Sequence, residues 1–171
     1  IQPGNYAIPT DASGNFHYLI DTGMYNVNIN TLPNHYSSKC PANGYNVTLN
    51  AAGGASGLDF GFVPVANVTD VNIVATPTRF RPGFTSRIYL NFGNAGTLPQ
   101  SGTINLTLAP MMTAGMSSQT IASQTGQTVT WNYAGLNPSQ IDGIWLEAAL
   151  DTSAQLGDTL CIIVNITSAV G

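Results

Sequence analysis

The stretch YNVNIN, residues 25–30, has an aromatic or aliphatic residue at every odd position and asparagine at every even position. Successive side chains of a β-strand point to opposite faces, so this period of two predicts a strand with one apolar face and one amide face. The pattern returns in FHYLI, residues 16–20, which predicts a further strand, in YNVTLN, residues 45–50, and again in RIYLNF, TINLTL, TVTWNY and IWLEAAL. Helical periodicity is nearly absent, and Gly, Pro and Asn clusters separate the runs. The sequence therefore predicts an all-β protein of antiparallel strands.

The composition excludes several classes of partner. Of the 171 residues 43% are hydrophobic, but only 7% are charged, against about 25% in an ordinary globular protein. Four Lys and Arg residues and a net charge of −4 leave no basic patch, so nucleic acid is not expected as a partner. No run approaches the length of a membrane-spanning helix. The chain has no signal-peptide pattern and starts abruptly at Ile1, as an excised mature segment would.

The pattern of strands changes near FVPVANVTD, residues 62–70. Residues 1–64 read as short hairpins, and a piece of this size buries only about 60% of its unfolded surface, so it is marginal alone. Residues 65–171 have the size of a complete immunoglobulin-like sandwich. We therefore expect two antiparallel β-sandwich modules in tandem, of immunoglobulin-like or prealbumin-like type.

The first piece resembles the carboxypeptidase-regulatory-like and SdrD B-like repeats of surface proteins. The residues that carry the resemblance are DASGNFHY (11–18), GMYNV (23–27) and the closing GLDFGF (57–62). The resemblance implies that residues 1–64 form part of such a sandwich module.

The second piece resembles the conserved repeat modules of large secreted bacterial proteins, particularly those exported by the type IX system. The resemblance rests on RPGFTSRIYLNFGNAGT, GTINLTL, VTWNYAGLNPSQ and LGDTLCIIVNIT, in this order and spacing. Such modules usually continue past a segment like NITSAVG, so the last strand is expected to be missing here or to come from a neighbouring copy. The resemblance implies a stalk or spacer unit of a cell-surface, adhesin-like protein.

The residues that enzyme chemistry needs are scarce. The chain has two histidines, His17 and His35, one glutamate, Glu147, and no GxSxG nucleophile turn. Two distant histidines do not indicate a metal site. We therefore expect a non-catalytic, secreted or cell-surface structural segment without cofactor, whose partners are neighbouring modules or like copies. The alternative is a module that binds a surface carbohydrate or protein.

Two aromatic residues are candidates for such binding. In IWLEAAL the alternation places Trp145 outward, opposite the apolar positions on either side of it, and Tyr89 is outward in RIYLNF in the same way. An outward aromatic ring can stack on a sugar or on another protein, although a covering loop or domain is the commoner reason for one. Trp131 shares its face with other apolar residues in TVTWNY and is expected in the core.

Polar corners are expected to bend the chain. Asp11, with Ser and Asn at the next alternate positions, faintly resembles a calcium loop, but the further carboxylates and the closing Glu are absent. A turn in which Asp11 bonds the backbone and Gly14 takes a positive φ is the favoured interpretation. Gly23, Asn94 and Gly96 are also expected in turns.

Two cysteines and one threonine are candidates for covalent chemistry. Exposed free thiols are a liability, so Cys40 and Cys161 are disulfide candidates and favour an oxidising compartment. The sequence leaves open whether they pair with each other or with residues outside the segment. Thr159 lies in a short DTL motif that resembles an O-glycosylation acceptor of bacteria with the type IX system.

Overall fold

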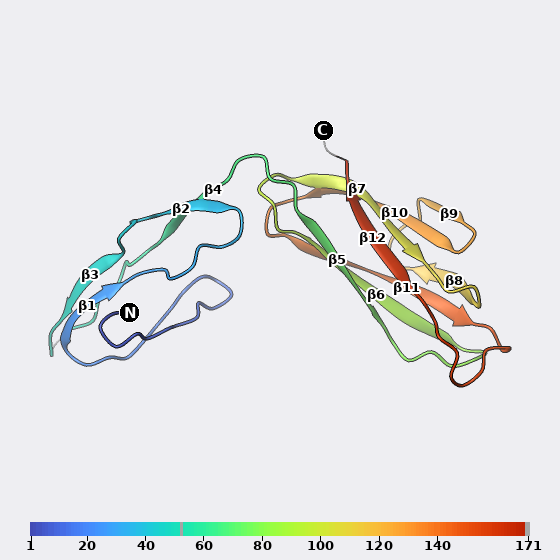
Figure 1. Ribbon diagram of the computed structural model, residues 1–171, viewed down its shortest axis with the longest axis horizontal. Helices are drawn as coiled ribbons and strands as arrows, with labels where there is room; N and C mark the ends of the chain where they lie inside the picture. The colour runs from blue at the N-terminus through green and yellow to red at the C-terminus, as the bar shows by residue number, and fades with distance from the viewer. Residues whose placement is uncertain (52, 170–171) are drawn as a thin grey trace. The chain divides into compact units, whose positions relative to one another are not determined.

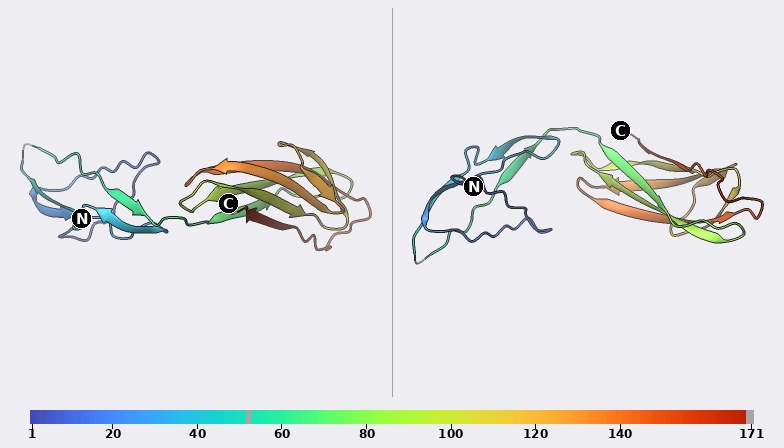
Figure 2. Two further views of the ribbon diagram at one scale, coloured as in Figure 1. Left: turned by 90° about the horizontal axis from the view of Figure 1, so that it is seen from above. Right: turned by 60° about the horizontal axis from the view of Figure 1, so that its bottom comes forward.

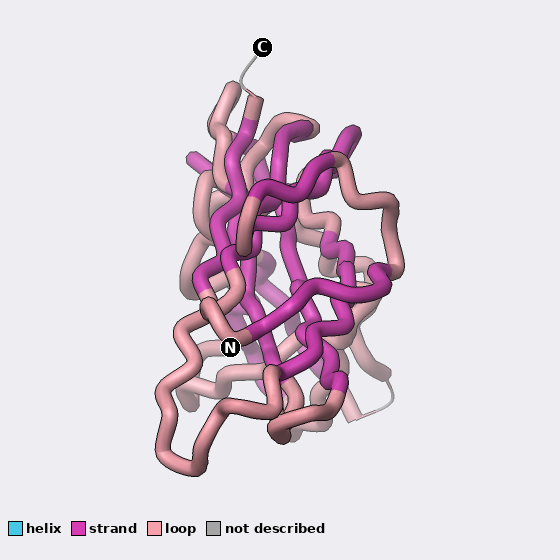
Figure 3. The backbone as a smooth tube through the Cα atoms, turned by 90° about the vertical axis from the view of Figure 1, so that its right-hand side faces the viewer, coloured by secondary structure: helices cyan, strands magenta, loops and turns pink. Residues whose placement is uncertain are grey.

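The computed structural model describes residues 1–51 and 53–169 (Figure 1). Within these ranges the chain forms strands and loops and contains no helix, as Figure 3 shows. Every pair of strands is antiparallel, so the prediction of an all-β sandwich fold is confirmed. The described residues include no helix long and apolar enough to cross a membrane. The chain divides into two compact units, Ile1–Val65 and Ala66–Gly171.

The N-terminal unit consists of two small sheets. Its strands are β1 (Gly23–Val27), β2 (Tyr36–Cys40), β3 (Tyr45–Leu49) and β4 (Gly61–Pro64). β1 pairs with β3, and β2 pairs with β4. The two asparagine-rich runs thus lie side by side, with Asn26 opposite Asn46 and the Asn26 Nδ2 donating to the Asn46 Oδ1 at 3.0 Å. The outward amides therefore bond across the sheet.

The structure differs from the sequence expectation at two places in this unit. Residues 16–20, whose apolar positions also alternate, form no strand. Alternation places side chains on two faces but supplies no partner for the main chain, and Phe16 and Tyr18 instead line hollows in the unit. Gly23 is the first residue of β1, where a turn was expected.

The C-terminal unit is a sandwich of two four-stranded sheets, seen as two layers in Figure 2. One sheet has the order β12-β7-β10-β9 and the other the order β5-β6-β11-β8. The strands are β5 (Val71–Pro77), β6 (Thr85–Asn94), β7 (Gln100–Thr107), β8 (Met112–Ser117), β9 (Ser123–Thr125), β10 (Thr128–Leu136), β11 (Ile141–Leu150) and β12 (Ile163–Ser168).

The core of this unit forms where the inner faces of the two sheets meet. Trp131 of β10 is fully buried, as expected, and its indole Nε1 donates to the Ser117 Oγ of β8 at 3.0 Å. The Phe92 and Tyr133 rings also meet between the sheets, with centroids 5.8 Å apart. Among the described residues Val27 is the single buried hydrophobic side chain of the N-terminal unit, so almost all of the dry core belongs to the C-terminal one.

Asn94 ties the two sheets together at the end of β6. Its side chain is buried, and its Nδ2 donates to the main-chain oxygens of Leu98 and of Leu136, the last residue of β10, at 2.7 and 2.9 Å. Its Oδ1 accepts the Gly96 N–H at 2.9 Å. A Cβ at Gly96 would lie 2.4 Å from the Val68 oxygen, so a glycine is required for the turn to close. Asn94 and Gly96 thus shape the turn that leads from one sheet to the other.

We expect Trp131→Ala to lower the free energy of unfolding by about 3–5 kcal/mol, because it empties a large site in a closed core. Urea unfolding followed by far-ultraviolet circular dichroism measures this change. The neighbouring Asn132→Ala, at an exposed position of the same strand, should stay within about 0.5 kcal/mol. Equal effects of the two substitutions would contradict the assignment of this core.

Candidate functional site

The two aromatic candidates lie together on the outward face of the sheet β5-β6-β11-β8. Tyr89 of β6 is directly opposite Trp145 of β11. Their strand neighbours, such as Leu90 and Leu146, are fully buried, so the two rings point away from the core. Tyr89 is 40% exposed, and Trp145 is partly buried. Residues that are 56 positions apart in the sequence therefore form one aromatic pair.

A charged pair lies beside the two rings, two residues away along each of the same two strands. Arg87 is opposite Glu147, and the Arg87 Nη2 lies 3.1 Å from the Glu147 Oε1. The guanidinium carbon also lies 4.4 Å from the centroid of the Trp145 ring, within the range of a cation–π contact. Arg87 therefore covers part of the ring while its charge is balanced by a neighbouring carboxylate.

Two neighbouring side chains stabilise the charged form of Arg87. The hydrogen bond from its guanidinium to Glu147, followed by the interaction with Tyr89, raises the pKa of Arg87 above its ordinary value. The sequence alone does not single out Arg87 as a site residue. A signal was present, because Arg87 and Tyr89 share one face of RIYLNF, but only the register of β6 against β11 places them beside Trp145 and Glu147.

The Asp11 corner is a hydrogen-bonded turn. The Asp11 Oδ1 accepts the N–H groups of Ser13 and Asn15 at 2.9 and 2.8 Å, and Gly14 has a φ of +82°. These donors, the Asn15 N–H first, lower the pKa of the Asp11 carboxyl. In the described part of the chain no group of three or more His, Cys, Asp or Glu residues could hold a metal ion.

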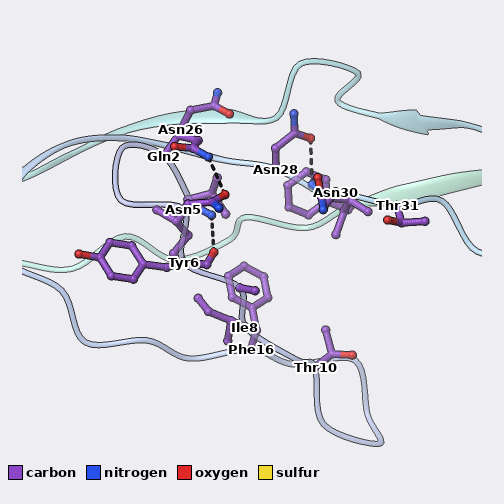
Figure 4. A pocket seen from close by; sticks show the side chains of 15 residues that line it. Gln2, Asn5, Tyr6, Ile8, Thr10, Phe16, Asn26, Asn28, Asn30 and Thr31 are labelled. Atoms are coloured by element: carbon purple, nitrogen blue, oxygen red, sulfur yellow. Dashed lines mark hydrogen bonds between the residues drawn. The ribbon is translucent and has the colours of Figure 1, made fainter.

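The N-terminal unit contains several hollows, and the one that Figure 4 shows has a volume of about 490 Å³. Ile8 and Phe16 of the first loop lie on one side, and Asn26 and Asn28 lie on the other (Figure 4). The Asn26 amide already donates to the main-chain oxygen of Asn43 at 3.1 Å. The residues that line the hollow, all of them described, include no carboxylate side chain and no histidine, so they offer no acid–base pair.

The remaining candidates are scattered along the chain, and all but the partly buried His35 are exposed. Cys40, the last residue of β2, and Cys161, which precedes β12, are both exposed and free in this structure, and their pairing in a disulfide stays a prediction. Thr159 lies in an exposed loop, where a modifying enzyme could reach it. His17 is exposed in a loop of the N-terminal unit, and His35, with a φ of +65°, directly precedes β2.

The comparisons with known proteins are sparse. No protein-family model matches the chain. No curated protein matches it either. A solved structure, the chitin-binding domain of a chitinase from Pyrococcus furiosus, is similar with 11% identity and a TM-score of 0.40. That similarity covers 59% of this chain and 99% of the other. It is too weak to carry a conclusion about binding or activity.

We expect Arg87→Ala to make the Trp145 ring more accessible, because the guanidinium now covers it. Acrylamide quenching of tryptophan fluorescence measures this accessibility, since Trp131 is fully buried and contributes little to the quenched fraction. The matched control Arg81→Ala removes another exposed arginine of the same unit and should leave quenching unchanged. Unchanged quenching in Arg87→Ala would show that the contact does not persist in solution.

The Asp11 carboxyl should titrate below the ordinary pKa of 3.8, because the turn donors stabilise its charged form. The folded pKa lies below the unfolded one, so the contribution of the turn is present above the unfolded pKa. It is lost as the pH falls through the folded one. Carbon-13 NMR of the side-chain carboxyl measures the midpoint, and Asp11→Ala should lose protection of the Ser13 and Asn15 amides from exchange. A midpoint at or above 3.8 would contradict the turn.

Proposed function

We propose that the chain is a non-catalytic structural segment of a secreted or cell-surface bacterial protein. In this role its modules space or present binding domains, or associate with like copies. The observation that supports the proposal most is the closed apolar core of the C-terminal unit, which no titratable side chain other than that of Tyr133 enters among the described residues. The sandwich thus offers rigidity, and the outer face of its sheet β12-β7-β10-β9 carries mainly hydroxyl and amide groups.

The family resemblance fits this role. Residues 1–64 and 65–171 resemble two kinds of surface-protein repeat, and we propose them as tandem modules of an adhesin-like protein. A surface with few charges can lie against a copy of itself with little repulsion and little dependence on salt. We also propose that such contacts join copies of the protein into filaments and that the protein is extracellular.

The test replaces residues 66–171 in the parent protein with an unrelated immunoglobulin-like sandwich of equal length. A spacer acts through its length and rigidity, so the replacement should keep surface display and adhesion of the parent, whereas deletion of the same residues should reduce adhesion. Loss of adhesion in both the replacement and the deletion would contradict the spacer role. Surface labelling and cell-adhesion counts supply the two measurements.

The paired rings of Tyr89 and Trp145 favour a second candidate function, a module that binds carbohydrate or protein. Neighbouring outward aromatic rings provide a large contact area at low cost in side-chain entropy. In this case the segment contributes to adhesion directly, and its binding surface is the outward face of β6 and β11.

A further inference from the structure

The outward face around Trp145 is arranged in two adjacent rows of side chains. In the first row Thr76 of β5, Tyr89 of β6 and Trp145 of β11 are paired across the sheet. In the second row Val74, Asn91 and Gly143 are paired in the same way; we call these six residues the Trp145 face. None of the six carries a formal charge near neutral pH.

Gly143 brings no side chain of its own to the place beside the tryptophan, and the Asn91 amide oxygen lies close above it. It lies two residues before Trp145 on β11, and therefore on the same face of the sheet. A Cβ at Gly143 would meet the Asn91 Oδ1 at 3.3 Å and the Leu90 main-chain oxygen at 3.5 Å. Trp145 thus has the Arg87 guanidinium on one side along the strands and a residue without a side chain on the other.

The groups around Trp145 are polar but uncharged, apart from one balanced pair. Asn91 is exposed, and its side-chain amide makes no hydrogen bond within the described residues. An amide offers both donors and an acceptor, and Thr76 adds an exposed hydroxyl. Val74 is 61% exposed and adds apolar surface. Arg87, the nearest cation, is already paired with Glu147 at 3.1 Å.

These groups match the chemistry of a neutral sugar. A pyranose ring has an apolar C–H face that stacks on an aromatic ring, and an edge of hydroxyls that need both donors and acceptors. A sulfated or acidic glycan would have to compete with Glu147 for the guanidinium. We propose that the Trp145 face binds a neutral saccharide, with one sugar ring stacked on Trp145 on the side away from Arg87 and its hydroxyls bonded to Asn91. This inference rests on the second candidate function and names its ligand.

The test begins with the full chain on an array of neutral, sialylated and sulfated glycans. We expect neutral glycans to be bound and the other two classes to be bound no better than their neutral cores. A blank array, or binding confined to sulfated or sialylated glycans, would overturn the inference. The proposed spacer role would survive either result, because the module replacement tests it separately.

Three substitutions then test the site with the neutral glycan that binds best. Trp145→Ala should weaken binding at least about tenfold, and Asn91→Ala should also weaken it, because they remove the stacking ring and the amide. Gly143→Val should weaken binding, because a side chain at this position would displace the Asn91 amide and crowd the Trp145 ring. The matched control Asn132→Ala removes an exposed amide from the outer face of the other sheet and should leave affinity unchanged.

Folding of each variant is checked by circular dichroism and thermal unfolding. Asn91 is exposed and outside the core, so Asn91→Ala keeps the test decisive even where Trp145→Ala unfolds. Wild-type affinity in folded Asn91→Ala and Gly143→Val would overturn the placement of the sugar. An equal loss in Asn132→Ala would overturn it as well.

Discussion

The burial of Trp131 between two sheets is the constraint on which the C-terminal unit depends. The ring fills the space between the inner faces, and its indole N–H finds a partner in Ser117 of the opposite sheet. Because that polar group is satisfied, burial of the ring costs no hydrogen bond. Asn94 meets the same requirement at the end of β6, where its buried amide bonds the main-chain oxygens of Leu98 in the following loop and of Leu136 in the opposite sheet. Because these buried groups hold the sheets together, the side chains on the outward faces are not needed for the core.

The N-terminal unit shows what happens when alternation is not matched by a large core. Its strands are short, Val27 is its one buried hydrophobic side chain among the described residues, and its loops surround hollows. Specific polar contacts hold this unit together to a greater extent than in the C-terminal unit. Two of them are the hydrogen bond between the side chains of Asn26 and Asn46 and the Asp11 turn. A small module has too little interior for its surface, so such contacts contribute a larger share of its stability.

The candidate site was predictable in part. Alternation correctly placed Tyr89 and Trp145 on outward faces and Trp131 in the core, because the direction of a side chain along a strand is a local property. The pairing of Tyr89 with Trp145, the cover supplied by Arg87 and the pairing of Gly143 with Asn91 depend on the register of β6 against β11. Register is a relation between distant segments, and no local pattern in either strand specifies it.

By itself, the amino-acid sequence determined the all-β class, the faces of the strands and the Asp11 turn, because period-two alternation and turn chemistry act over a few residues. Only the tertiary structure decided that residues 16–20 form no strand and that Gly23 begins one, since a strand exists only where its main chain finds a partner. It also decided which outward residues became neighbours. That choice follows from the packing of two sheets around one core, which is a property of the whole unit.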